Sequence, residues 1–465
     1  GSTISAGGDV RVGDNITHNT TIENNIILQS VTDDSITAIV DGITKVMNKK
    51  LEPFREFMEK HGAKSFQTAD KRYNIESLTN ANFQFLIGQA GHDKTLPAEL
   101  ARNLIGDGDE WIKSLGRALL KQGIPVSDDR MEIFQNYDWF IQVFLQKMSS
   151  KPGQEKTLRR LSFMAEAYQA SLRYLCYIQM AQAFQLENKP KLAIISEFIQ
   201  MEGNKFLDFD YASLLLIATD LLGQNGFMKE IDNFVEELTD TGSDLFGTSF
   251  FLETQRRNLM TNNIPDDDKL PGLLDEYLTA LVYWLRKISF LANYRLVSIK
   301  EINLNYRLGS PEHYLHRYGE PHSFYNEGGV SDKSRSIQIK GSFTYSRSII
   351  LFRGNVLAAC MKNIQDKTSY LSLSPLVIDK SVYADENTKQ TPEIFYYSGY
   401  EKKERKSERQ YIYTPYQKEL PFGTTSEKDK YPPLYVKATN TNQSGLDELF
   451  EYLEDVFNPF KNEPS

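Results

Sequence analysis

The chain has 465 residues, enough for about two to four domains of ordinary size. Its formal net charge of -9 excludes a generally basic surface, so nucleic acid is not an expected partner. A hydrophobic content of 40% excludes a wholly disordered chain, and two cysteines exclude a disulfide framework, so the cytoplasm is the expected compartment. No apolar run approaches the roughly 18 residues of a membrane span, so a membrane partner is not expected.

The first thirty residues alternate between apolar and polar side chains. Even positions from Val10 to Leu28 carry most of the apolar residues, and odd positions are polar until Ile27. This period predicts a strand with one buried face, or two or three short strands where Gly13-Asp14-Asn15 turns the chain. Because an isolated hairpin is only marginally stable in water, its apolar face needs a partner.

A helix with heptad-like spacing is predicted next, with apolar residues recurring every three or four positions from Ile36 to Met58. Together, residues 1–62 are interpreted as an oligomerisation stem. An edge hairpin and an ordinary amphipathic helix, both packed on their own domain, are the alternative. The residues predicted to mediate self-association are Val10, Val12, Ile16, Ile22, Ile26, Leu28, Ile36, Val40, Ile43 and Met47.

The segment Gly7-Gly8-Asp9-Val10-Arg11-Val12-Gly13-Asp14-Asn15, with the Thr/Asn-rich alternation after it, resembles short Gly-Asp/Asn segments of bacterial immune and signalling proteins. The resemblance covers about twenty of the 465 residues. It implies self-association through intermolecular β-structure and a role in bacterial anti-phage defence or stress response. Similar composition also occurs in phage fibre β-coils, so an adhesin remains open.

Residues 63–297 are predicted to form an irregular helical bundle. The segment 210–222 is apolar on all sides, which indicates a central buried helix. The segment from Gly88 to Thr95 lacks the Gly-Lys-Thr adjacency of a phosphate-binding loop, and no cofactor or metal is expected. The predicted helices are 155–186, 210–222, 228–240 and 273–296.

Residues 298–465 are predicted to form a tyrosine-rich α+β domain, since 16 of the 25 tyrosines follow residue 300. The predicted architecture is a six-stranded antiparallel sheet covered by a helix at 445–456. The predicted strands are 336–340, 343–352, 370–378, 393–400, 410–413 and 433–438. The fold class of the whole chain is therefore predicted as α+β.

One cluster of candidate catalytic residues lies where the bundle and the sheet meet: His313, His316, Arg317 and His322. On a helix, His313 and His316 would be neighbours able to share a metal ion. The Arg317-to-His322 spacing resembles the Arg-x4-His motif of helical HEPN ribonucleases, although Gly319 and Pro321 interrupt the helix that carries the motif in that family. A polar loop joining the two regions is the alternative.

These observations predict an oligomerising intracellular interaction or signalling protein that acts by assembly and by binding a protein partner. No complete catalytic motif is present, so an enzyme is not the preferred interpretation. The alternative is a His-dependent nuclease or hydrolase centred on residues 313–322.

Overall fold

The computed structural model describes residues 95–461, with interruptions. The interruptions are residues 107, 188, 190, 203–204, 208, 241–242, 262, 264, 306–312, 322–334, 340–345, 357–358, 361–363, 365, 384–391, 403–408, 417–431 and 439–444. The predicted stem, residues 1–62, therefore lies outside the described residues.

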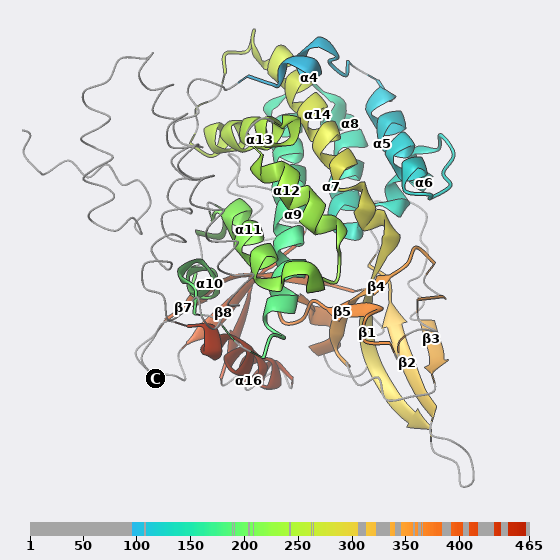
Figure 1. The fold of residues 1–465 in the computed structure, drawn as a ribbon, viewed down its shortest axis with the longest axis vertical. Coiled ribbons are helices and arrows are strands. Elements are labelled where there is room, and N and C mark those ends of the chain that lie inside the picture. The colour runs from blue at the N-terminus through green and yellow to red at the C-terminus, as the bar shows by residue number, and fades with distance from the viewer. Residues whose placement is uncertain are drawn as a thin grey trace, which may run out of the picture.

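Helices occupy the described part of the chain up to residue 287, and sheets follow, as Figure 1 shows. The helices of this first part are α4 (Ala98–Arg102), α5 (Glu110–Lys121), α6 (Arg130–Asn136), α7 (Trp139–Ser149), α8 (Lys151–Gln154), α9 (Leu158–Ala183), α10 (Ala193–Ile199), α11 (Tyr211–Leu222), α12 (Glu230–Thr239), α13 (Asp244–Met260) and α14 (Leu270–Lys287). Short 3-10 turns are η1 (Lys205–Leu207), η2 (Gly223–Asn225) and η3 (Ser289–Asn293).

Helix α9 is the centre of the helical region. It contacts α7, α11, α13 and α14, and nearly all of its residues are buried. Only four of its 26 residues are charged, so it can be enclosed on every side. Helix α11 is also buried over most of its length, which confirms the central buried helix predicted at 210–222.

The described residues of the C-terminal region form two antiparallel sheets. The first has strand order β3-β2-β1-β4-β5, and the second has the order β6-β7-β8-β9. The strands are β1 (Tyr294–Asn305), β2 (His313–Gly319), β3 (Arg335–Ile339), β4 (Ser348–Arg353), β5 (Tyr370–Ser372), β6 (Val377–Asp379), β7 (Ile394–Glu401), β8 (Gln410–Pro415) and β9 (Leu434–Lys437). Turn η4 (Lys380–Tyr383), helix α16 (Leu446–Phe457) and turn η6 (Asn458–Phe460) complete this region. The chain is thus an α+β protein with a helical region and C-terminal antiparallel sheets, as predicted.

One hydrophobic cluster runs through both regions, from Leu96 in the first to Phe460 in the second. The five-stranded sheet divides its strand residues between two cores. Leu296 and Leu351 belong to the large cluster, whereas Val297 and Ile350 belong to a small one on the other face. This division follows from the alternation of side chains along a strand. The sheets and the helices therefore share a core.

The predicted single six-stranded sheet is wrong, because the segment 370–378 contributes β5 to one sheet and β6 to the other.

The predicted helix 273–296 is too long. Helix α14 ends at Lys287, and β1 begins at Tyr294 and pairs with β4. Apolar residues at helical spacing continue past Lys287, but they enter the core through η3 instead of a further helical turn.

None of the helices in the described part of the chain combines the length and the apolar character that a bilayer span requires. Several tyrosines of the second sheet lie in the core. Tyr397, Tyr411 and Tyr413 are fully buried, whereas Tyr435 of β9 is 42% exposed and Tyr452 of the neighbouring helix α16 is 43% exposed. Most of the tyrosine content described in this sheet is therefore core.

Candidate functional site

The histidine-rich segment forms a strand instead of a helix. Strand β2 pairs with β1 on one side and β3 on the other. Positions three apart on a strand lie on opposite faces, about 10 Å from each other, whereas on a helix they are neighbours. The helical spacing predicted for His313 and His316 is therefore wrong, and the spacing no longer argues for a shared metal ion.

His316 and Arg317 occupy consecutive positions of β2 with different surroundings. His316 is fully buried, and its Nδ1 lies 3.3 Å from the carbonyl oxygen of Tyr314. Arg317 donates from Nη1 to Oε2 of Glu301 on β1 at 2.9 Å, and both side chains are partly exposed. Among the described residues, no group of three or more His, Cys, Asp or Glu side chains could hold a metal ion. His322 lies outside the described residues, so the hydrolase alternative itself stays a prediction.

The ten residues predicted to mediate self-association, from Val10 to Met47, all lie outside the described residues. Their role stays a prediction as well.

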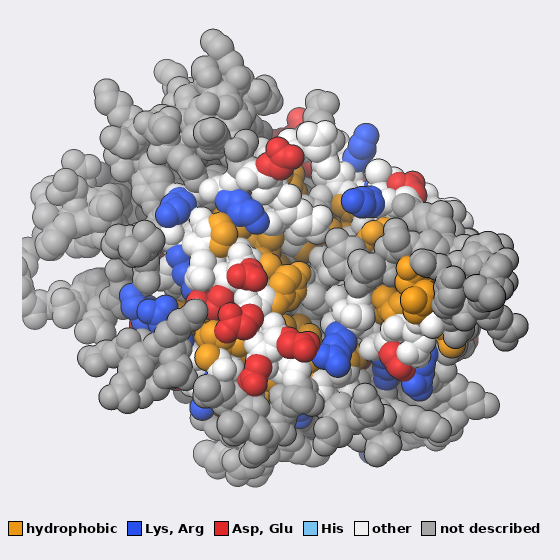
Figure 2. Space-filling model, turned by 90° about the horizontal axis from the view of Figure 1, so that it is seen from below, with side chains coloured by type: hydrophobic (Ala, Val, Ile, Leu, Met, Phe, Trp, Pro, Cys, Tyr) orange, Lys and Arg blue, Asp and Glu red, His pale blue; other side chains and the backbone are white. Residues whose placement is uncertain are grey.

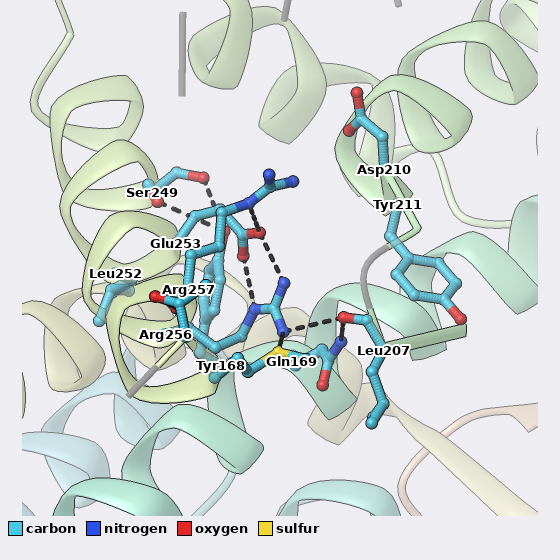
Figure 3. A network of polar contacts seen from close by, with 12 residues as sticks. Tyr168, Gln169, Leu207, Asp210, Tyr211, Ser249, Leu252, Glu253, Arg256 and Arg257 are labelled. Carbon is cyan, nitrogen blue, oxygen red and sulfur yellow. Dashed lines mark hydrogen bonds and ion pairs between the residues drawn. The ribbon is translucent and has the colours of Figure 1, made fainter. Parts of the chain in front are cut away.

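A buried ion-pair network in the helical region was missed by the sequence analysis. Glu253 of α13 accepts from Arg256 through both carboxylate oxygens, at 2.7 and 2.9 Å, and from Arg257 at 2.9 Å (Figure 3). Arg256 also donates to the carbonyl oxygen of Leu207 at 2.9 Å, and Gln169 of α9 donates to the same oxygen at 2.7 Å. We call these five residues the Arg256 cluster. It ties α9, α13 and η1 together.

The Arg256 cluster encloses the charges of Glu253 and Arg256, whereas the Arg257 side chain is partly exposed. Burial alone would raise the pKa of the Glu253 carboxyl, but the guanidinium groups of Arg256 and Arg257 outweigh this and hold the pKa below its usual value. Arg256 is only 1% exposed, and Glu253 and the Leu207 carbonyl are among the groups that compensate its charge. Such a pair is costly to break, because one buried charge would remain uncompensated.

A hollow of about 10 Å³ borders the Arg256 cluster, between α9, the start of α11 and α13. Its walls include Tyr168, Asp210, Tyr211 and Arg256. This volume admits roughly one water molecule, so the hollow has no room for an organic substrate. Burial raises the pKa of Asp210 to about 6, although hydrogen bonds from Ser213 work against the shift.

A second buried polar group, which we call the Asp138 cluster, lies where α7, α9 and the C-terminal region meet. Tyr174 of α9 donates to Asp138, and Tyr416 donates to the carbonyl oxygen of Phe140. The Phe140 ring lies between the two tyrosines, with centroids 4.5 Å from Tyr174 and 4.4 Å from Tyr416. Burial raises the pKa of Asp138 to about 6.

Two further buried cations of the helical region lie against aromatic rings. The guanidinium carbon of Arg173 is 3.9 Å from the centroid of the Tyr396 ring on β7. Lys147 pairs with Glu166 at 3.9 Å and lies 5.2 Å from the Phe144 centroid. Desolvated cations interact favourably with aromatic faces, which reduces the cost of burying these charges.

The sequence did contain a signal for these clusters. The sequence predicts a helix over 155–186 with a single apolar face, which implies that Glu166, Gln169 and Arg173 are exposed. All three are buried in α9. The small number of charged residues in this helix was the available indication that its polar side chains have partners inside the protein.

No protein-family model, curated protein or solved structure matches this chain.

Proposed function

We propose that this protein is a self-associating interaction protein, assembled through residues 1–62 and presenting residues 95–461 to a protein partner. The observation that carries the proposal is the apolar alternation from Val10 to Leu28, followed by heptad-like spacing to Met58. A long alternating face needs a matching apolar surface, and an identical segment supplies one by symmetry.

The core of the described residues supports the proposal. A single hydrophobic cluster joins the helices to the sheets, so the apolar faces of both regions are largely covered by each other. Self-association through the N-terminal segment would then display many copies of one coherent body. Tyr435 on β9 and Tyr452 on α16 are large, partly exposed side chains of this body and are candidates for contact with a partner.

The biological setting is proposed from the N-terminal resemblance. Self-associating Gly-Asp/Asn segments belong to bacterial immune and signalling proteins, so we place this protein in a cytoplasmic anti-phage or stress-response system. In that setting, assembly would bring the partner proteins together.

The mass of the full chain in solution tests the proposal. We expect light scattering to give a multiple of 53.3 kDa for the wild type and a smaller mass for the double variant Ile16→Asp/Ile22→Asp, because a buried apolar face does not tolerate carboxylates. The matched control is Thr17→Asp/Thr21→Asp, which places the same charges on the polar face and should keep the wild-type mass. A wild-type mass of 53.3 kDa at all concentrations would contradict the proposal.

A further inference from the structure

Strand β9 lies at the edge of the second sheet. It pairs with β8 on one side, and no strand in the described part of the chain pairs with its other side. Between described residues, the segment 434–436 forms no backbone hydrogen bond outside its ladder with β8. An edge strand directs backbone N–H and C=O groups away from the sheet, where a further extended segment can pair with them. The outer side of β9 therefore offers a backbone template for one more strand.

The side chains of β9 alternate between a buried and an exposed face. Leu434 and Val436 are buried in the large hydrophobic cluster, and helix α16 packs against the strand. Tyr435 and Lys437 are exposed on the opposite face. Because successive side chains of a strand point to opposite faces, an added strand would place every second side chain on the α16 face and the others on the Tyr435 face.

One side of helix α16 is directed away from β9. On this side, Glu448 forms an ion pair with Arg347 at 3.1 Å. One turn later, Tyr452 donates to the carbonyl oxygen of Ser374 at 3.4 Å. Ser374 lies directly before β6, which is the opposite edge of the second sheet from β9.

The other side of α16 is directed toward β9 and is acidic. Glu454 lies on this side and accepts from Tyr411 of β8, which pairs with Val436 of β9. Asp447 and Glu451 precede Glu454 at helical spacing and therefore share its side of the helix. Both are exposed, and Glu451 forms no ion pair with a described residue. Figure 2 shows acidic side chains gathered at this end of the molecule.

We propose that β9 binds an extended segment of a protein partner as a further strand of the second sheet, and that this segment alternates basic and apolar side chains. Backbone hydrogen bonds to β9 supply the affinity, and the basic side chains lie on the face of Asp447 and Glu451. The apolar side chains lie on the other face, beside the ring of Tyr435. The role of this surface in partner recognition rests on the proposed function, whereas the binding itself belongs to residues 95–461.

The charge of α16 selects the occupant of this edge. The N-terminal segment of the chain also alternates with a period of two, but residues 10–28 contain two acidic side chains and a single Lys or Arg, Arg11. Their net charge is negative, so this segment would meet Asp447 and Glu451 with like charge. A basic segment of another protein has the complementary charge.

Fluorescence anisotropy with the full chain and short labelled peptides tests the proposal. A peptide in which lysine and valine alternate should bind saturably. An alternating glutamate–valine peptide should bind about tenfold more weakly, because it meets the acidic side of α16 with like charge. A lysine–valine peptide with N-methylated central residues should also bind about tenfold more weakly, because it lacks the backbone donors. No binding by the first peptide, or equal binding by either comparison peptide, overturns the proposal.

Two charge reversals separate the β9 side of α16 from the overall charge of the protein. Glu451→Lys should weaken binding of the lysine–valine peptide by about three- to tenfold, because an attractive charge beside the edge becomes repulsive. The matched control is Glu236→Lys, which makes the same change at an exposed position of α12 and should keep the wild-type affinity. Both positions are exposed, so both variants should fold. Equal effects of the two variants overturn the assignment to this edge.

The variant Ile16→Asp/Ile22→Asp separates peptide binding from the proposed self-association. It should bind the lysine–valine peptide as tightly as the wild type, because β9 and α16 lie outside residues 1–62. Binding by both proteins supports the proposed edge site. A wild type that has the expected multiple of 53.3 kDa but does not bind the peptide overturns the edge site and leaves the self-association intact.

Discussion

The helical and sheet regions bury polar groups in different ways. Around α9 and α13, charged side chains are enclosed together, as in the pairs of Glu253 with Arg256 and Glu166 with Lys147. In the second sheet, two buried tyrosines donate their hydroxyls to backbone carbonyls, whereas the Tyr411 hydroxyl donates to Glu454, which forms a buried ion pair with Lys461. Tyr413 donates to Pro375 at 2.7 Å, and Tyr397 donates to Ile199 in the helical region. A hydroxyl needs one acceptor, whereas a charge needs a partner charge and several hydrogen bonds.

Tyrosine residues also form hydrogen bonds that join the helical region to the second sheet. Tyr177 of α9 donates to the carbonyl oxygen of Tyr397 at 2.6 Å, and the backbone N–H of Tyr400 donates to the carbonyl oxygen of Met201 at 2.7 Å. Each tyrosine contributes a large apolar ring as well as its hydroxyl. The joint therefore combines hydrophobic burial with hydrogen bonds, and it also buries the charge of Arg173 against the Tyr396 ring.

The surface at the α16 end of the molecule is rich in acidic side chains. Figure 2 shows acidic side chains gathered on this face, together with small apolar areas. Helix α16 exposes Asp447, Glu448 and Glu451 and buries Leu449, Phe450 and Leu453 against the sheet. Its amphipathic pattern is the reason it was predicted from sequence.

The largest expected effect tests the charged core of the helical region. Glu253→Gln should lower the free energy of unfolding by about 3–5 kcal/mol, because Arg256 would remain buried without its counter-charge. Urea unfolding measures this change. The control is Asp266→Asn, which removes an ion pair with Lys269 whose side chains are 78% and 70% exposed, and it should have no measurable effect. Equal effects of the two variants would show that burial does not distinguish the two ion pairs.

An intermediate effect is expected for the joint between the regions. Tyr397→Phe removes the hydroxyl that donates to Ile199 and should cost about 1–3 kcal/mol, because the carbonyl oxygen of Ile199 is left buried and unsatisfied. Thermal unfolding with Tyr435→Phe as the control measures it, since the Tyr435 side chain is 42% exposed. A Tyr397→Phe variant as stable as the control would mean that ring packing alone joins the regions.

The smallest expected effects come from two glycines and have opposite signs. Gly445, before α16, has a φ of +106°, and an added Cβ would lie 3.2 Å from Arg347 and 3.3 Å from Tyr383, so Gly445→Ala should cost about 1–2 kcal/mol. Gly272 lies in the first turn of α14 with open space around it, and Gly272→Ala should stabilise by about 0.5–1 kcal/mol. Melting temperatures that move in the same direction for both variants would contradict this account.

Sequence patterns predicted the local elements well where one period dominates. The helices predicted at 155–186, 210–222 and 228–240 correspond to α9, α11 and α12, and the strands predicted at 393–400 and 433–438 correspond to β7 and β9. The prediction was weaker where the pattern is short or ambiguous. Strand β2 carries His313, His316 and Arg317, and nothing in its seven residues separates a strand from a polar loop without its partners β1 and β3.

The candidate sites were harder to predict than the elements. Glu253, Arg256 and Leu207 lie up to 49 residues apart in the sequence, and Tyr416 lies 276 residues from Phe140. A pattern that extends over one or two turns of helix has no information about such pairs. The histidines, which are close in sequence, were more visible than the buried charges, which are close only in space.

The sequence by itself determined the acidic charge, the alternating N-terminal segment and the order of helical and strand-rich regions, because these depend on composition and on periods of two to four residues. Tertiary structure decided which polar residues are buried, that the sheet is divided in two, and that Asp138 and Asp210 both lie against α9. These features depend on long-range packing, where a carboxylate acquires its pKa from the groups that enclose it and not from its neighbours in the chain.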